Sequence, residues 1–325
     1  MDSQHPTVSI VCPCHNEEDN IEPLVKRLQK TLDNCPELYE IILVDDGSAD
    51  ATWRVIEDVS CRYPSVRGLR LSRNFGHQNA LLAGLSGARG QAIISMDSDL
   101  QHPPEVIPEL LDEWRNGAQI VVTTREPDND SASFFKRKSS SLFYRIFTVL
   151  AGIEIRKGSS DFRLIDREAL AILIKFAGKD QFLRGSVEWM GYRSSVVPYV
   201  VESRNAGRTK YNFRRMIRFA ATAVTSFSNR PLRAGIWLGV IVGFLALLEL
   251  FYVLTVALSG KSVPGWASTV GVMSFLFAIL FIMVGIIGVY ISRIHSLLQD
   301  RPTYIVTESV GLPQATNHQA AKRVE

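Results

Sequence analysis

Asp97-Ser98-Asp99 is the part of this sequence whose residue types and spacing best suit chemistry. An apolar run at 92–96 precedes it and Pro103-Pro104 follows, which predicts a buried strand, a turn and then a helix. Carboxylates two apart on an extended strand point to the same side, and such oxygen ligands suit Mg²⁺ or Mn²⁺ holding a diphosphate. The alternative is that these acids only close the strand and cap the next helix.

A second acidic motif, Asp45-Asp46-Gly47-Ser48, follows the apolar run 41–44. A carboxylate here could accept hydrogen bonds from a nucleoside, and Gly47 allows a sharp turn. A plain turn with a capping acid explains the same residues. No G-x-x-x-x-G-K-[ST] sequence occurs, and no G-x-G-x-x-G follows the first expected strand, which disfavours P-loop and Rossmann nucleotide sites. Gly84, Gly87 and Gly90 are expected to serve packing and turns.

Residues 6–200 alternate between apolar segments of strand length and segments with helical periodicity. This α/β pattern predicts a mostly parallel sheet with helices on both faces and a ligand site beyond the carboxyl ends of the strands. The expected strands are 8–12, 40–44, 68–71, 92–96 and 119–123, and the expected helices are 20–34, 52–63, 79–88 and 104–117.

Two apolar runs, 236–258 and 268–292, are each long enough to cross a hydrocarbon core of about 30 Å. The one charged residue in them is Glu249, which is expected to make a polar contact between helices or subunits. A short link joins the runs and arginines flank their outer ends, so we expect a transmembrane hairpin with the catalytic part and both termini in the cytoplasm.

The stretch 203–233 holds eight Lys or Arg residues and no acid, with apolar residues at helical spacing. It predicts a basic amphipathic helix in the membrane surface, although a core helix of the soluble domain would show the same pattern. The net charge of +3 does not suggest a general nucleic-acid binder. No cleavable signal peptide is expected, the four cysteines are expected to be reduced, and the tail after 311 is expected to be disordered.

The chain resembles the family 2 inverting glycosyltransferases of the GT-A fold. The motifs that carry the resemblance stand in the family's order: 13–17 (PCHNE), 45–48 (DDGS), 97–105 (DSDLQHPPE) and 124–125 (TR). The later stretch 160–164 (SDFRL), basic residues and an apolar hairpin are similar to the polyprenyl-phosphate branch, GtrB-type and dolichyl-phosphate mannose synthase-like. The resemblance covers about 6–305. It implies a GT-A catalytic domain at 1–203, a juxtamembrane segment at 204–233, two transmembrane helices at 234–293 and a cytoplasmic tail at 294–325.

The same resemblance implies roles for the donor side of the site. Pro13, Glu17 and Asp46 would bind the donor nucleoside. Further residues would act at the diphosphate and sugar: Asp97 and Asp99 on Mg²⁺ or Mn²⁺ and the phosphates, Gln101 on the sugar side, and Arg125 near the diphosphate. The family often has an aromatic residue after its first proline, whereas this chain has Cys14-His15, so that His15 would either stack on the base or face solvent.

On the acceptor side, the resemblance implies a basic clamp for a lipid phosphate. Its members would be Arg204, Arg208 and Lys210, while Arg137 and Ser141 would lie near the donor diphosphate and the incoming acceptor phosphate. Asp161 would line the acceptor side, either as a base or as an orienting or structural group. The acceptor phosphate is already largely anionic at neutral pH, so its oxygen needs no strong general base.

The expected function is inverting transfer of a hexose, with glucose from UDP-glucose as first candidate, to polyprenyl phosphate at the cytoplasmic membrane face. The family also suggests a homo-oligomer formed through the transmembrane helices. One alternative is a processive polysaccharide synthase, but the chain lacks a Q-x-x-R-W motif and enough helices for a polymer channel. The other is a non-catalytic membrane protein that binds a nucleotide-sugar, against which Asp97, Asp99 and Arg125 argue.

Overall fold

The structure of the chain is a computed structural model that describes residues 6–125, 159–177, 183–200, 230–259, 265–299 and 301–311. Contacts divide the described chain into two compact units. One unit contains a β-sheet with its covering helices, and the other contains two long apolar helices.

The first unit is built on an eight-stranded sheet with the strand order β7-β5-β6-β4-β1-β2-β3-β8. Its strands are β1 (Val8–Cys14), β2 (Tyr39–Asp45), β3 (Val66–Leu71), β4 (Ala92–Ser95), β5 (Ile120–Arg125), β6 (Ser159–Asp166), β7 (Ser194–Tyr199) and β8 (Val306–Val310). The central strands β4, β1, β2 and β3 are parallel to one another. Strand β6 runs antiparallel between β4 and β5, and β8 runs antiparallel along β3. The expected mostly parallel sheet is confirmed at its centre.

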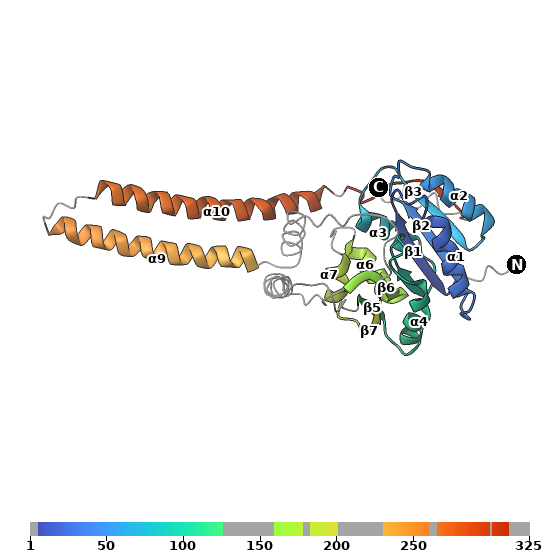
Figure 1. Ribbon diagram of the computed structural model, residues 1–325. Coiled ribbons are helices and arrows are strands. Elements are labelled where there is room, and N and C mark those ends of the chain that lie inside the picture. The colour runs from blue at the N-terminus through green and yellow to red at the C-terminus, as the bar shows by residue number, and fades with distance from the viewer. Residues whose placement is uncertain are drawn as a thin grey trace. The chain divides into compact units, whose positions relative to one another are not determined.

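Helices cover both faces of this sheet (Figure 1). The helices are α1 (Ile21–Leu32), α2 (Thr52–Arg62) and α4 (Ile107–Arg115) with a short 3-10 helix (Pro104–Val106) on one face, and α3 (His77–Gly87), α6 (Arg167–Ala177) and α7 (Leu183–Trp189) on the other. Successive side chains along each strand point to opposite faces of the sheet and pack into two separate hydrophobic cores. In β2, for example, Leu43 packs into the first core and Ile42 into the second.

Gly84 explains how α3 lies so close to the sheet. A Cβ atom at this position would come within 2.3 Å of Cγ1 of Val11 in β1. Only glycine leaves room for this approach, which confirms the packing role expected for Gly84.

The expected strands and helices of the first 125 residues are all present, with ends that differ by a few residues. Strands β6, β7 and β8 are additions that the sequence patterns did not predict. Strand β8 lies within the stretch expected to be a tail, 294–325, and joins the sheet edge instead.

The second unit consists of α9 (Arg230–Leu258) and α10 (Trp266–Leu298). Within α10, Gly271–Leu298 contains an 18-residue window with a mean hydropathy of 2.8 and is long and apolar enough to cross a membrane. The apolar part of α9, Leu232–Leu248, is shorter. Glu249 lies inside α9. Most of the expected amphipathic segment, 204–229, and the chain after 311 lie outside the described residues.

Candidate functional site

A cavity lies at the carboxyl ends of β1, β2 and β4, the edge at which α/β sheets bind ligands. Its volume is about 430 Å³, within the range of small-molecule sites. The residues that line it are Pro13, Cys14, His15, Glu17, Asp46, Asn74, Gly76, His77, Ala80, Asp97, Ser98, Asp99 and Asp161. Six predicted site residues are among them: Pro13, Glu17, Asp46, Asp97, Asp99 and Asp161.

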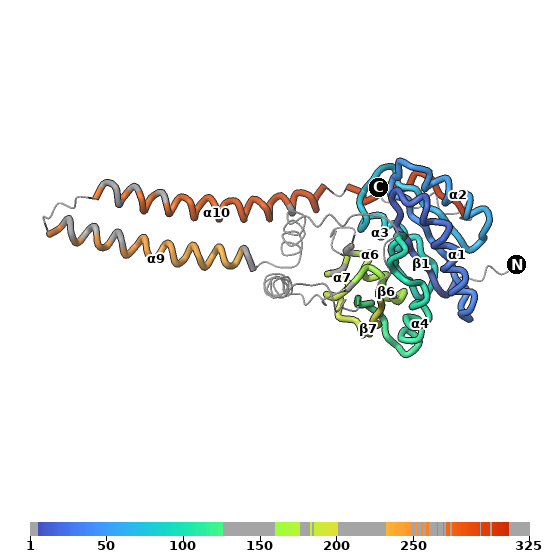
Figure 2. Tube along the Cα trace, viewed as in Figure 1, coloured from blue at the N-terminus to red at the C-terminus, as the bar shows by residue number. Residues whose placement is uncertain are grey.

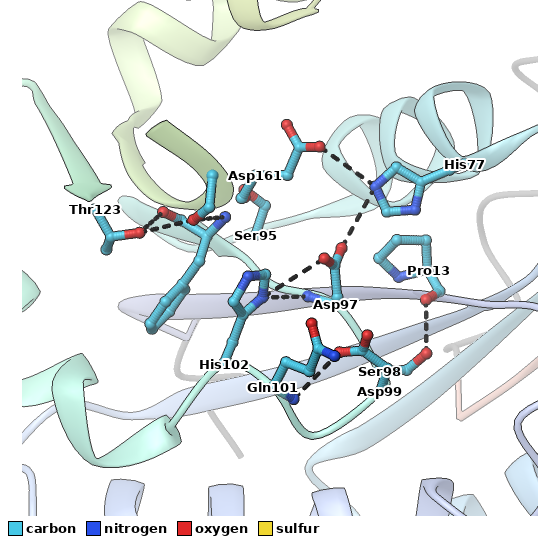
Figure 3. Close-up of polar contacts among 12 residues, drawn as sticks. Pro13, His77, Ser95, Asp97, Ser98, Asp99, Gln101, His102, Thr123 and Asp161 are labelled. Carbon is cyan, nitrogen blue, oxygen red and sulfur yellow. Dashed lines mark hydrogen bonds and ion pairs between the residues drawn. The ribbon is translucent and has the colours of Figure 1, made fainter. Parts of the chain in front are cut away.

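Asp97 and Asp99 reach the cavity from a loop after β4 (Figure 3). The prediction that an extended strand presents them is wrong, because β4 ends at Ser95. Hydrogen bonds shape the loop instead: the backbone N–H of Asp97 donates to Nδ1 of His102 at 3.0 Å, and that of Gln101 donates to Oδ1 of Asp99 at 3.2 Å. Both acidic residues nevertheless line the same cavity.

His102 supports this loop from inside the protein. Its side chain is fully buried, and its ring stacks on Phe162 at a centroid distance of 5.3 Å. Burial disfavours the imidazolium form and lowers the pKa of His102, so the ring is neutral at neutral pH. Because Nδ1 accepts the N–H of Asp97, the proton of the neutral ring sits on Nε2.

His77 lies between two acidic residues of the cavity. Its Nε2 atom is 3.4 Å from Oδ1 of Asp97 and 3.6 Å from Oδ2 of Asp161 (Figure 3). The sequence patterns did not single out this residue. A signal was present, because the segment 72–77 (SRNFGH), which carries four polar residues, follows the third expected strand at the ligand-binding edge of the sheet.

Asp161 stands at the same end of the cavity as His77 and is almost fully buried. Its Oδ1 accepts a hydrogen bond from Nη2 of Arg163 at 2.5 Å, and its Oδ2 accepts one from Nε2 of Gln78 at 3.2 Å. The buried guanidinium stabilises the carboxylate form. This pairing and the bond from Gln78 hold the carboxylate of Asp161 in a fixed orientation.

Asp46 joins two loops of the cavity wall. Its two carboxylate oxygens accept the backbone N–H groups of Phe75 at 2.7 Å and Gly76 at 2.9 Å. Burial raises the pKa of Asp46, and these hydrogen bonds partly oppose that effect. The neighbouring Gly47 has φ of +62°, and a Cβ there would lie 2.4 Å from the backbone carbon of Arg73. Gly47 therefore provides both the sharp turn and the close approach of the two loops.

His15 extends the wall next to Asp46. Its Nδ1 lies 3.0 Å from the backbone oxygen of Asp46, and its Nε2 lies 3.0 Å from Nδ2 of Asn74. These contacts hold an exposed imidazole beside the cavity. Glu17, also in the lining, accepts a hydrogen bond from Nδ2 of Asn20 at 2.5 Å.

One feature of the acidic residues fits a divalent cation, and a second limits how many ligands they could give it. Oδ1 of Asp97 is buried and has no hydrogen-bond partner among the described residues. In the same part of the chain, no group of three or more His, Cys, Asp or Glu residues is arranged to hold a metal. The protein would thus supply only part of the coordination shell, as Mg²⁺ sites completed by substrate phosphates do.

Two predicted site residues lie outside the cavity lining, and others are not described. Gln101 contributes a backbone hydrogen bond to the loop, and Nε of Arg125 donates to the hydroxyl of Tyr199 at 3.2 Å. The remaining predicted residues lie outside the described ranges and are Arg137, Ser141, Arg204, Arg208 and Lys210.

Comparison with known proteins shows similarity along nearly the whole chain. Residues 9–173 match the model of Glycosyl transferase family 2. An uncharacterized glycosyltransferase of Bacillus subtilis, YkcC, is 36% identical over 95% of this chain and 96% of its own length. A bactoprenol glucosyl transferase of Shigella flexneri, derived from prophage SfII, is 34% identical over 93% of this chain and 98% of its own length.

A prophage bactoprenol glucosyl transferase homolog of Escherichia coli is also 34% identical, over 92% of this chain and 98% of its own length. Among solved structures, glucosyl-3-phosphoglycerate synthase from Mycobacterium tuberculosis in complex with Mn²⁺ and UDP-glucose overlaps 68% of this chain and 77% of its own, with 19% identity and a TM-score of 0.44.

Proposed function

Because this chain belongs to glycosyltransferase family 2 and is a glycosyltransferase, we propose that it transfers a hexose from a nucleotide-sugar to polyprenyl phosphate. UDP-glucose is the first candidate donor. The observation that carries this proposal is the end-to-end similarity to bactoprenol glucosyl transferases, which extends well beyond the matched family model at 9–173. The acid-lined cavity at the sheet edge supplies a place for the donor.

The two halves of the cavity suit the two halves of a nucleotide-sugar. Pro13, Glu17 and Asp46 would bind the nucleoside, and the exposed ring of His15 would stand beside the base. Asp97 and Asp99 would hold Mg²⁺ or Mn²⁺ with the diphosphate. When bound, such an ion neutralises charge that develops on the leaving diphosphate. Gln101 would act at the sugar and Arg125 at the diphosphate, although neither residue lines the cavity itself.

In the proposed reaction, a phosphate oxygen of the acceptor forms a bond to the anomeric carbon as the bond to the donor diphosphate breaks. Displacement from the opposite face inverts the anomeric centre, which gives a β-linked product from an α-linked donor. A phosphate monoester is already largely anionic at neutral pH and requires no strong base. The ion pair of Asp161 with Arg163 agrees with an orienting role for Asp161.

The acceptor side would combine membrane attachment with a basic clamp. We assign the clamp to the residues that family resemblance indicates, Arg204, Arg208 and Lys210, with Arg137 and Ser141 near the donor diphosphate and the acceptor phosphate. Arginine matches phosphate geometry, so such a cluster suits two phosphorylated reactants brought close together. The segment 204–233 would lie in the membrane surface, where a lipid phosphate meets a water-soluble donor.

We further propose that α9 and α10 cross the membrane as a hairpin. The apolar segment Gly271–Leu298 supports one crossing, and the chain order supports a second. The catalytic sheet contains strands from before α9 and also β8, which follows α10. An even number of crossings returns the chain to the side on which it started. The arginines at the outer ends of the helices favour the cytoplasmic side, and the helices would also form the contacts of a homo-oligomer.

The test is a transfer assay with full-length protein in lipid nanodiscs. Polyprenyl phosphate, Mg²⁺ and a panel of radiolabelled nucleotide-sugars are supplied, and the lipid fraction is extracted and counted. We expect label in the lipid from one donor, UDP-glucose first. Asp99→Ala should remove it, while the matched change Asp112→Ala, at an exposed acidic residue of α4, should not. Absence of lipid label from every donor would refute the proposal.

A further inference from the structure

The segment that follows α10 returns to the donor side of the catalytic sheet. Strand β8 pairs antiparallel with β3, and Figure 2 shows this red C-terminal stretch beside the blue N-terminal part of the sheet unit. Just before β8, the backbone oxygen of Ile305 accepts the N–H of Ser72 at 2.9 Å. Ser72 is the first residue after β3, where the loop that lines the cavity begins.

Glu308 in β8 ties this segment to two side chains of the sheet unit. Its Oε1 accepts a hydrogen bond from Nη1 of Arg70 in β3 at 2.8 Å, and its Oε2 accepts one from Nε1 of Trp53 in α2 at 3.1 Å. The guanidinium of Arg70 also lies over the Trp53 ring, 5.7 Å from its centroid. The carboxylate thereby fixes the direction of the Arg70 side chain.

Arg70 carries this contact on to the cavity wall. Its Nε lies 3.5 Å from Oδ2 of the buried Asp45 at the end of β2. The other oxygen of Asp45 accepts the N–H of Ser48 at 2.9 Å and so shapes the 46–48 turn. Asp46 in that turn holds the 73–76 loop through its two backbone hydrogen bonds. A continuous set of polar contacts thus runs from β8 to both loops on the nucleoside side.

We propose that Glu308 is a positioning residue for the donor: by holding Arg70, it sets the 46–48 turn and the 73–76 loop in the geometry that binds the nucleoside. The chain after the last apolar helix is then part of the donor-binding scaffold. This inference rests on the proposed function, since it takes a nucleoside diphosphate to be the ligand of the cavity.

The effect should fall on donor binding more than on stability. The side chains of Arg70 and Glu308 are 35% and 49% exposed, and partly exposed ion pairs add little to the free energy of unfolding. The loops they position line the cavity, so a small change in loop geometry would alter the affinity for a donor bound there. A merely structural role would lower the active fraction and leave the donor KM unchanged.

The experiment compares full-length wild type with Glu308→Ala, Glu308→Gln and the control Ser309→Ala, an exposed neighbour on β8. Calorimetry with UDP and Mn²⁺ measures Kd, and the transfer assay measures KM for the donor and for polyprenyl phosphate. We expect Glu308→Ala to raise the UDP Kd and donor KM about three- to tenfold, with the acceptor KM unchanged. Glu308→Gln, which keeps an acceptor oxygen, should give a smaller rise, and Ser309→Ala none.

A double-mutant cycle that combines Arg70→Gln with Glu308→Ala measures the coupling of the two residues in UDP binding, even if each single variant loses some stability. The effects of Arg70→Gln and Glu308→Ala on UDP affinity should be non-additive, because each substitution removes the same contact between Arg70 and Glu308. Wild-type affinity in Glu308→Ala, or additive effects in the cycle, would overturn this inference alone. Failure of the wild type to bind any nucleotide would overturn the proposed function as well.

Discussion

Glu40 at the amino ends of the parallel strands and Asp97 at their carboxyl ends differ in how their carboxylates are hydrogen-bonded. At the amino ends, Glu40 accepts hydrogen bonds from Oγ of Ser9 at 2.6 Å and from the N–H of Arg89 at 2.7 Å, and it also pairs with Arg67. At the carboxyl ends, Oδ1 of Asp97 is buried without a hydrogen-bond partner among the described residues. It lies 3.4 Å from Nε2 of the half-exposed His77. Buried polar groups are normally hydrogen-bonded, so this oxygen marks the end where a ligand would complete the structure.

We expect the paired charges at the amino ends of the strands to stabilise the fold, and the acidic residues at the carboxyl ends to serve function. Burial lowers the pKa of Arg67, and the nearby Glu40 opposes that effect. A buried pair of this kind is costly to break, because the remaining charge loses its partner. The carboxyl ends instead hold acidic residues that repel one another, an arrangement that a cation and a basic clamp would relieve.

The largest effect should come from the acids at the carboxyl ends. Asp99→Ala should lower kcat by about 100- to 1000-fold, as loss of a charge-stabilising group does in other enzymes. The free energy of unfolding should change by less than about 1 kcal/mol, as for most changes outside the core. Transfer kinetics and chemical denaturation measure the two quantities. Near-normal turnover would contradict the metal-binding role.

Changes at the amino ends should show the opposite behaviour. Glu40→Ala should cost about 3–5 kcal/mol of stability, because it leaves the guanidinium of Arg67 buried and unpaired. Once corrected for the folded fraction, turnover should stay within about twofold of wild type. Urea denaturation followed by circular dichroism measures the loss. A stable Glu40→Ala variant with poor turnover would reverse the comparison of the two ends.

A substitution at Gly47 should affect both stability and donor binding, because this residue lies in the turn beside the cavity. Gly47→Ala places a side chain at φ of +62° and 2.4 Å from the Arg73 backbone, which should cost about 1–3 kcal/mol. The strain falls on the two loops that Asp46 joins, so the donor KM should rise while the acceptor KM stays constant. Gly191→Ala is a matched control with φ of +67° and no neighbouring atom within 4 Å. Equal donor KM values in the two variants would argue against a role for this turn in binding.

The smallest effect concerns the thiols. Cys12 and Cys14 are buried, and burial raises the pKa of Cys14 to about 12, whereas Cys61 is exposed. Iodoacetamide at pH 7.5, about one unit below the usual thiol pKa, should modify Cys61 first and leave Cys12 and Cys14 unmodified in the folded protein. Mass spectrometry of peptides from a time course reads this out. Fast modification of Cys14 would mean that the cavity floor at the carboxyl ends is open to solvent.

The periodicity of the sequence predicted the central sheet well, because the strands from β1 to β4 are mostly apolar and each is followed by a segment of helical length. Strand β8 escaped prediction because its partner lies far away in the chain: Glu308 and Arg70 are 238 positions apart. Local patterns carry no information about such a pairing. Its exposed and polar residues also resemble those of an unstructured tail.

Sequence motifs allowed some residues of the candidate site to be predicted. Residues that reach the site only through contacts between distant segments could not be predicted. Asp97, Asp99 and Asp46 follow apolar runs, so their place at the sheet edge could be inferred. The position of His77 between Asp97 and Asp161 could not, since it depends on how α3 approaches β4 and β6. The pairing of Asp161 with Arg163 is local by comparison, because residues two apart on a strand point to the same side, but β6 itself was not predicted.

The most direct test of the central claim is calorimetric binding of UDP to full-length protein, with Mn²⁺ and then with excess chelator. The claim is that Asp97 and Asp99 hold a cation and a nucleoside diphosphate at the carboxyl ends of the sheet. It predicts measurable affinity with Mn²⁺ and at least about a tenfold loss, or about 1.4 kcal/mol, on chelation or in Asp99→Asn. Equal UDP affinity in all three conditions would contradict it.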